Sequence, residues 1–422
     1  MKSSIRKIHP AKSGCSIPKP LPMIHAKAWL IPVFLFIAFL EFWISNRQGK
    51  PYFSQANSAM NLTIGAIDQI VSLLGFYLLF LALEFVYSHF RIFTWENTWQ
   101  QWVLAYLAVD FVSYWYHRYC HRINILWAGH ITHHSSSYFN FTNGFRTSPF
   151  QGLNRIPFWL VLPVLGFSPF VLVFTLKISG LFDFLQHTQW VPRLGFIEKI
   201  FITPSLHRVH HGKNDLYLDK NFGSTFSFWD RLFGTYQKET EPVVYGLTNS
   251  GYEDKNPWSA IFYQYQLIWD NVKTSSSWKA KLGYLFFAPS WIAKNPVTVR
   301  KPESGLPLNK RTGSFSYCWL QMAGGAVTVI LLLAFQDFLP GWVFLSMAIF
   351  SITGMVLATQ SLNQVASPSF RNKEQVRLAL TAIPGIWMFE TEPNLVWLAL
   401  LLFLVVSFFL SLAMKGSVVS TG

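Results

Sequence analysis

Apolar stretches of about 20 residues with almost no charge constrain this chain most strongly, because a helix of that length crosses the hydrocarbon core of a bilayer. Such stretches lie at residues 28–45, 64–87 and 99–116, and again at 315–335, 339–359, 376–389 and 394–414. Only 13% of the 422 residues are charged and 51% are hydrophobic, which excludes a disordered chain and is too apolar for a soluble domain. We therefore predict an all-α, multi-pass integral membrane protein.

A further apolar run, residues 156–186, is too long for one ordinary span and is interrupted at residues 166–169 by a Gly-Phe-Ser-Pro sequence. We predict a helical hairpin with its tip at this interruption. From about residue 189 to residue 313 the chain is polar and mixed in charge, which predicts a membrane-proximal cap.

The charge and the cysteines exclude other classes of protein. The net charge of +14 arises from basic residues in the loops and termini between apolar segments, where anionic lipid headgroups are the natural partner. We therefore expect a membrane partner and no nucleic acid. The three cysteines lie far apart in the sequence and form no CxxC pair, so neither a disulfide framework nor a thiolate metal site is indicated.

Most of the histidines gather in the middle of the chain at spacings that suit metal ligands. Residues 117–121 read HxxxH, residues 130–134 and 207–211 each read HxxHH, and His187 stands alone between them. On a helix, residues three and four apart share a face, so each box directs two or three imidazoles toward one point. Three such boxes within about 100 residues are a strong sign of a metal centre.

Isolated histidines carry a weaker signal than the boxes do. His9, His25 and His89 are isolated, and we expect none of them to have a metal role. The boxes themselves could instead form a proton or metal relay in a transporter. A relay needs a chain of spaced groups, however, whereas these histidines are bunched at ligand spacing.

The number and type of ligands narrow the choice of metal. Eight or nine imidazoles without a thiolate exceed what one ion can use, which favours two ions. The HExxH, GxSxG and Walker patterns are absent, which argues against zinc proteases, serine hydrolases and P-loop enzymes. We favour iron, because a membrane enzyme acting on hydrocarbon chains must attack unactivated C–H bonds with an oxidant derived from O2.

These boxes resemble those of the fatty acid hydroxylase/sterol desaturase superfamily of integral membrane di-iron oxygenases. The flanking strings WAGHITHHSS (127–136), TPSLHRVHHGKN (203–214), DKNFG (219–223), WDRLFGT (229–235) and VYGLT (244–248) are similar to its ether-lipid-cleaving branch, alkylglycerol monooxygenase. The similarity extends from about residue 52 to about residue 288. One departure is Arg122, which stands where the animal members of this branch are expected to have an acidic residue.

The resemblance implies a set of residues and a reaction. The catalytic residues and ligands of two Fe ions would be His117, His121, His130, His133, His134, His187, His207, His210 and His211. Enzymes of this branch use O2 to hydroxylate the carbon next to the ether oxygen of an alkylglycerol, which releases a fatty aldehyde. The electron donor would be tetrahydrobiopterin, as in the animal enzymes, or a redox protein. A sterol or fatty acid hydroxylase or desaturase of the same superfamily is the alternative.

With this resemblance we divide the chain into four parts. They are a basic N-terminus with membrane anchor helices (1–98), a fatty acid hydroxylase-like di-iron catalytic domain (99–240), a polar cap extension (241–314) and a C-terminal transmembrane block (315–422). The membrane would be the endoplasmic reticulum in a eukaryote or the inner membrane in a bacterium.

Two sets of residues near the boxes are candidates for supporting roles. Carboxylates could orient the imidazole N–H groups, and the candidates are Asp110, Asp215 and Asp219. Aromatic side chains could line an acyl channel or simply pack, and these are Trp115, Tyr116, Tyr138, Phe139 and Phe141.

Overall fold

The computed structural model describes residues 21–248, 252, 256–295, 315–363, 368–392 and 394–413. These residues form helices joined by loops, with two isolated β-bridges, Phe201 to Phe226 and Gly212 to Tyr245. The prediction of an all-α fold is confirmed.

The first half of the chain contains four longer helices, α1, α2, α3 and α8, together with α4 and several short helices. In chain order these elements are α1 (Leu21–Arg47), α2 (Gln55–Phe90), α3 (Trp99–Arg122), α4 (Asn124–His134), η1 (Phe141–Phe145), α5 (Gln151–Asn154), α6 (Ile156–Trp159), α7 (Val161–Val164) and α8 (Pro169–Leu185). The cap follows with η2 (Gly195–Lys199), α9 (Pro204–His210), α10 (Phe228–Leu232), α11 (Pro257–Thr274), α12 (Trp278–Phe286) and α13 (Pro289–Lys294). The C-terminal block contains α14 (Phe315–Phe335), α15 (Gly341–Asn363), α16 (Pro368–Thr391) and α17 (Leu395–Ala413).

Five of the described helices are long and apolar enough to cross a membrane, and they confirm the prediction of several membrane helices. They are α1, α2, α14, α15 and α17. Many of their large apolar side chains face outward, for example Trp29 at 77% exposure and Phe409 at 63%, as lipid contact requires. The predicted stretches 99–116 and 376–389 lie within α3 and α16, which are less apolar helices and are not among the five.

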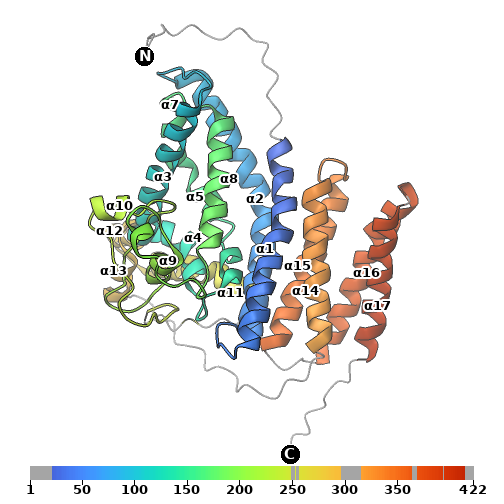
Figure 1. The fold of residues 1–422 in the computed structure, drawn as a ribbon. Coiled ribbons are helices and arrows are strands. Elements are labelled where there is room, and N and C mark those ends of the chain that lie inside the picture. Colours follow the sequence, from blue (N-terminus) through green and yellow to red (C-terminus); the bar gives the residue numbers. More distant parts are fainter. Residues whose placement is uncertain are drawn as a thin grey trace, which may run out of the picture.

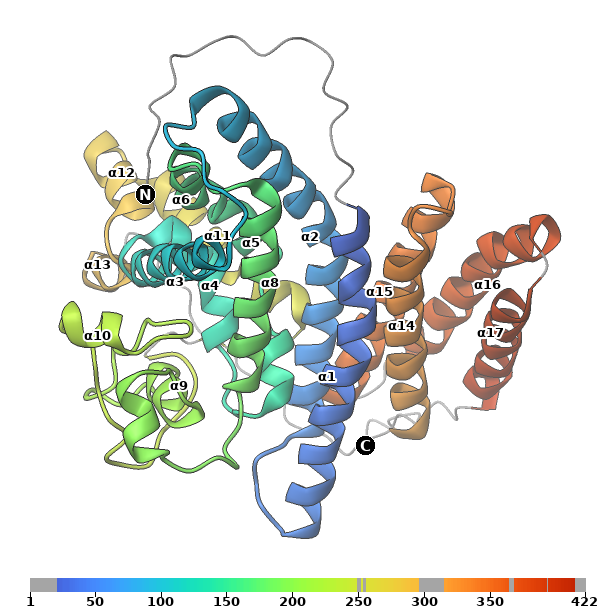
Figure 2. The same ribbon diagram turned by 45° about the horizontal axis from the view of Figure 1, so that its top comes forward.

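The C-terminal block packs mainly against the N-terminal helices and lies away from α9 and α10. Helix α14 contacts α1, α2 and α15, and α16 and α17 pack on the far side. Figures 1 and 2 both show α16 and α17 at the opposite end of the molecule from α9 and α10. A buried ion pair in α16, Arg377 Nη2 to Glu374 Oε1 at 2.6 Å, lies in this block, and Arg377 Nη2 also donates to Gln321 of α14.

The chain reverses at the interruption in the apolar run 156–186, as the sequence predicted. The arm before it is split into the short helices α5, α6 and α7, because Pro157 and Pro163 cannot donate backbone hydrogen bonds. At the tip, Gly166 has φ +91°, and an added Cβ would lie 2.1 Å from the carbonyl oxygen of Phe93. Both α7 and α8 contact α2. The reversal returns the chain toward α3 and α4, so that the end of α8 and the helix α9 meet the first two histidine boxes.

Candidate metal centre

Helices α3 and α4 bring the first two boxes together. His117 and His121 lie one turn apart near the end of α3, and α4 begins two residues later and carries His130, His133 and His134. The two helices pack against each other across this short turn. The i, i+4 spacing therefore directs both boxes to one place, as the sequence predicted.

The remaining four histidines come from α8 and α9. His187 follows the C-cap residue of α8, and its ring Nδ1 lies 2.8 Å from the carbonyl oxygen of Asp183 in the last turn of that helix. Helix α9 starts with a proline at its first position and is capped by the Thr203 hydroxyl, which accepts from Leu206 N. It carries His207 and His210, and His211 is its C-cap residue.

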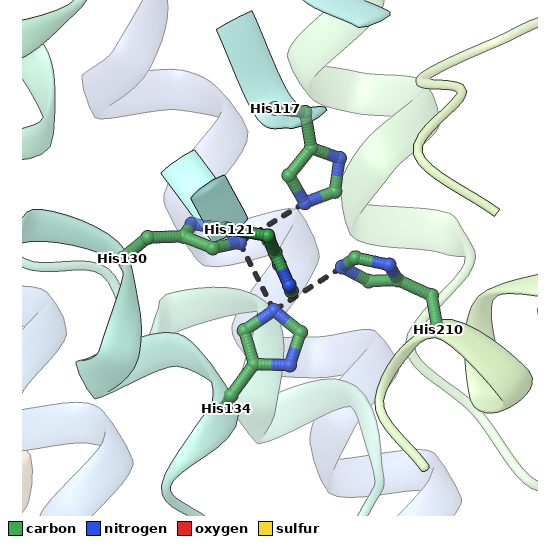
Figure 3. Close-up of side chains that lie close together, drawn as sticks. All are labelled: His117, His121, His130, His134 and His210. Carbon is green, nitrogen blue, oxygen red and sulfur yellow. Dashed lines mark hydrogen bonds between the residues drawn. The ribbon is translucent and has the colours of Figure 1, made fainter. Parts of the chain in front are cut away.

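All nine predicted histidines meet, and their ring nitrogens form two groups. In each group the nitrogens lie within 4.8 Å of one another. Group A comprises His117, His121, His130, His134 and His210, whose rings converge in Figure 3. Group B comprises His133, His187, His207 and His211. Sequence reasoning found these nine residues, but their spacing along the chain does not indicate how they divide between two groups.

The spacing of the nitrogens within each group is uniform. In group A, the Nε2–Nε2 distances along the series His117, His130, His134 and His210 are 3.0, 3.0 and 3.1 Å. In group B, the corresponding distances along the series His133, His187, His207 and His211 are 3.3, 3.1 and 3.1 Å. A metal about 2.1 Å from two nitrogens at right angles would place them about 3.0 Å apart. The spacing therefore fits the edges of two coordination polyhedra.

The outer nitrogens of the rings show which nitrogens are free to bind a metal. In four histidines Nδ1 lies 2.8 to 3.2 Å from a backbone carbonyl oxygen, namely His117, His133, His187 and His210. A carbonyl only accepts, so Nδ1 carries the proton and Nε2 presents a lone pair. In His133 and His187 two such lone pairs face each other at 3.3 Å. A cation between them would remove this repulsion.

Burial keeps the histidines neutral, which metal binding requires. Burial, followed by the nearby His121, lowers the pKa of His117 to about 3. Burial also lowers the pKa of His187 to about 4. For the other buried members of both groups the pKa is likewise lowered by burial. At neutral pH a proton therefore does not bridge the facing nitrogens, and the donor set fits metal ions.

One loop, residues 219–223, orients three of the five rings of group A. Its backbone carbonyls at Lys220 and Phe222 accept from His210 and His117, and the Asp219 carboxylate lies 3.4 Å from His121 Nδ1. The Nε2 of His121 is buried and has no hydrogen-bond partner among the described residues, so it is available to a metal. The loop makes an unusual turn, with positive φ at Asp219 (57°) and at its third residue (53°).

Two buried side chains hold this loop in place. Asp230 accepts from the backbone N–H groups of Phe222 (2.7 Å) and Gly223 (2.9 Å), and from the Thr235 hydroxyl. Asn221 donates to the carbonyl of Leu206 in α9. Neither role was predicted. Both residues lie in strings that carry the family resemblance, Asn221 in DKNFG and Asp230 in WDRLFGT. Only the structure shows that Asp230 holds the loop whose carbonyl orients His117.

Of the three carboxylates that were candidates for orienting imidazoles, one lies beside a histidine and two do not. Asp219 lies beside His121, as predicted, and also 3.7 Å from Arg122. Asp110 instead accepts from the backbone of Thr225 and Phe226 and from the Trp229 indole, so it anchors a loop. Asp215 is exposed. The interpretation of these last two as residues that orient imidazoles is wrong, because Asp110 binds a loop and an indole rather than a histidine, and Asp215 is exposed.

The isolated histidines and the aromatic residues lie mostly outside the two groups. His89 is exposed and its Nδ1 contacts the carbonyl of Phe85, whereas His9 and the side chain of His25 lie outside the described residues. Of the aromatic candidates, Tyr116 lines the cavity described next. Phe139 stacks on His187, Phe141 on Phe184, and Trp115 packs against Phe233.

A cavity of about 410 Å³ adjoins both groups. His117 and His130 of group A and His133, His187 and His207 of group B line it. From there it extends between α1, α2 and α8, whose apolar side chains Leu30, Phe34, Leu79, Leu176 and Leu181 form its walls. None of the described residues of the C-terminal block lines it. Its volume, its apolar walls and the histidines that line it suit a lipid chain with one end at the histidines.

Comparison with known proteins agrees with this geometry. Residues 102–235, which contain all nine histidines, match the model of the fatty acid hydroxylase family. This part of the chain is therefore similar to fatty acid hydroxylases. The matched region runs from α3, apart from its first three residues, to α10 and includes the loop that orients group A, so the matched region and the site coincide.

The chain is also similar to enzymes that are named for their action on lipids. Alkylglycerol monooxygenase of Danio rerio is 38% identical over 208 residues, which cover 49% of this chain and 46% of the relative. The Homo sapiens enzyme is 34% identical over 263 residues, which cover 62% of this chain and 58% of the relative. Ornithine lipid hydroxylase OlsE of Rhizobium tropici is 31% identical over 160 residues, which cover 37% of this chain and 47% of the relative. The chain thus spans about half the length of the curated relatives that it matches. No solved structure is significantly similar to it.

Proposed function

We propose that this protein is an O2-dependent membrane di-iron monooxygenase that hydroxylates the carbon next to the ether oxygen of an alkylglycerol. The hemiacetal that results collapses to a fatty aldehyde and a glycerol. The observation that carries the proposal is the division of nine buried or partly buried imidazoles into two groups beside one cavity. The 34% to 38% identity to alkylglycerol monooxygenases supports the choice of substrate class.

In this proposal group A and group B each hold one Fe ion, with the nine histidines as ligands. Iron bound there would supply the oxidant derived from O2 that an unactivated C–H bond requires. In the balanced reaction one oxygen atom enters the substrate C–H bond and the other leaves as water. Two electrons and two protons come from an external donor, a tetrahydropterin or a redox protein.

The chain's own residues prepare the site for this chemistry. The carbonyls of Phe222, Lys220, Arg146 and Asp183 hold the Nδ1 protons of four rings, which fixes their orientation toward the metals. Apolar side chains of α1, α2 and α8 would pack against a bound lipid chain and displace water from around it. They also align a chain with its end at the histidines, which provides proximity.

The test is release of long-chain aldehyde from 1-O-hexadecylglycerol by membranes that contain the protein, with O2 and a supplied tetrahydropterin. We expect aldehyde from the wild type and none from His133→Ala. His89→Ala is the matched control, because His89 is exposed and remote from both groups, and this variant should keep wild-type activity. Absence of aldehyde from wild-type protein that retains iron would contradict the substrate.

A second candidate is hydroxylation of another membrane lipid. The similarity to an ornithine lipid hydroxylase favours it, because that match also falls in a lipid-acting enzyme. The same membranes can be supplied with acyl lipids or sterols and the products analysed by mass. A product heavier by one oxygen atom, with no aldehyde from the alkylglycerol, would favour this second function.

A further inference from the structure

One wall of the cavity carries three polar side chains at intervals of four residues, Gln151, Arg155 and Trp159 on α5, α6 and the residue between them. Each has a buried polar atom without a hydrogen-bond partner among the described residues. These atoms are Gln151 Oε1, Arg155 Nε and Trp159 Nε1. The wall therefore offers one acceptor and two N–H donors, which we call the polar wall.

Unpaired atoms of this kind are rare in folded proteins. Leaving a buried polar atom without a partner is unfavourable, so native structures satisfy nearly all of them. Trp159 is only 2% exposed, so bulk water does not supply its partner. Three unpaired atoms on residues that line the same cavity indicate that a bound molecule pairs with them.

The polar wall lies next to the histidines. The backbone carbonyl of Gln151 accepts from the Tyr116 hydroxyl at 3.2 Å, and Tyr116 precedes His117. The Arg155 guanidinium lies over the rings of Tyr116 and Trp159, 5.7 Å from each centroid. Gln151, Arg155 and Trp159 line the same cavity as His117 and His130 of group A, so a polar group held here shares that cavity with group A, while an attached chain extends between α1, α2 and α8.

The charge of the cavity indicates what kind of polar group fits. The charged side chains that line it, other than the histidines, are two acids and two bases, namely Asp68, Asp183, Arg155 and Lys177. Their charges balance, so the cavity favours neither an anionic nor a cationic headgroup. A neutral group that both donates and accepts hydrogen bonds, such as a diol, matches the polar wall.

We propose that Gln151, Arg155 and Trp159 bind the uncharged polyol headgroup of the lipid substrate. A hydroxyl donates to Gln151 Oε1, and hydroxyl or ether oxygens accept from Arg155 Nε and Trp159 Nε1. The claim that this binding leads to hydroxylation rests on the proposed function. The claim that the polar wall binds the headgroup does not. It explains how the enzyme would select a lipid by its headgroup and present the adjacent carbon.

The test is a binding assay with purified protein in nanodiscs. Bound, tritiated 1-O-hexadecylglycerol is displaced by three unlabelled lipids: 1-O-hexadecylglycerol, hexadecyl methyl ether, which keeps the chain and the ether but has no hydroxyls, and 1-O-hexadecylglycerol 3-phosphate. We expect the diol to bind at least about tenfold more tightly than either of the others, because only the diol satisfies the polar wall without adding charge.

Variants assign the binding to the polar wall. Trp159→Phe and Gln151→Leu each remove one hydrogen-bonding atom, and each should weaken diol binding about tenfold while leaving binding of the methyl ether unchanged. Trp102→Phe is the matched control, since the Trp102 indole donates to Asn97 and does not line the cavity. Retention of wild-type iron shows that a variant is folded.

The outcomes separate this inference from the proposed function. Diol binding that is equal in wild type, Trp159→Phe and Gln151→Leu overturns the inference, even if aldehyde is released. Tighter binding of the phosphate also overturns it, because the site would then select an anion. Selective diol binding without aldehyde release supports the polar wall and contradicts the alkylglycerol reaction.

Discussion

Asp230 holds the loop that orients three histidines of group A, so its substitution should change how tightly group A retains its metal. The two carboxylate oxygens of Asp230 accept from Phe222 N and Gly223 N at 2.7 and 2.9 Å, and the Phe222 carbonyl accepts from His117. In Asp230→Asn the amide NH2 must face one of these N–H groups. One buried donor then loses its partner, which costs about 1–3 kcal/mol, and the loop that orients His117, His121 and His210 loosens.

We expect Asp230→Asn to weaken metal binding in group A about 10- to 100-fold, the usual effect of losing a residue that orients a ligand. The assay is the rate at which a chelator extracts iron from the purified protein. One of two iron ions should leave faster than in wild type, while the other leaves at the wild-type rate. The exposed Asp215→Asn is the matched control and should behave as wild type. Unchanged extraction of both ions from Asp230→Asn would refute the link through the loop.

Three further predictions concern the fold and its pH dependence. Gly166→Ala should lower the midpoint of thermal unfolding, since φ +91° costs an alanine about 1–2 kcal/mol and its Cβ would meet the Phe93 carbonyl; an unchanged midpoint would contradict the tight tip. Arg377→Met should destabilise by about 3–5 kcal/mol, because it leaves Glu374 buried without its partner, yet iron content should not change. The iron-free protein should lose stability as the pH falls below about 6.5. In the unfolded chain His117 and His187 then bind protons, whereas in the folded protein burial lowers their pKa to about 3 and about 4 and they stay neutral. Thermal scans at pH 7.5 and 5.5 test the last point, and equal midpoints would contradict it.

The sequence predicted much of the site because local spacing determines it. The HxxxH and HxxHH boxes fix which face of α3, α4 and α9 carries the imidazoles, and this follows from helical periodicity alone. The interruption at residues 166–169 likewise predicted the reversal that brings His187 and α9 back to the boxes. These features depend on residues within a few positions of one another.

Features that depend on distant residues were not predicted. The division into two groups requires His134 to join His210 across 76 residues, and no local pattern encodes that distance. Asp110 was a candidate for orienting an imidazole, but it binds the backbone of a loop 115 residues later. The polar wall was also missed, because Gln151, Arg155 and Trp159 lie in or beside an apolar run whose pattern suggests only a membrane hairpin.

The central claim, two iron ions held by two separate groups of histidines, is tested most directly by counting the iron in single variants. We predict two iron ions per chain in the wild type. His121→Ala removes a ligand from group A and His211→Ala removes one from group B, and each should leave about one ion, whereas the double variant should leave none. One ion per wild-type chain, or loss of both ions from either single variant, would contradict two separate sites.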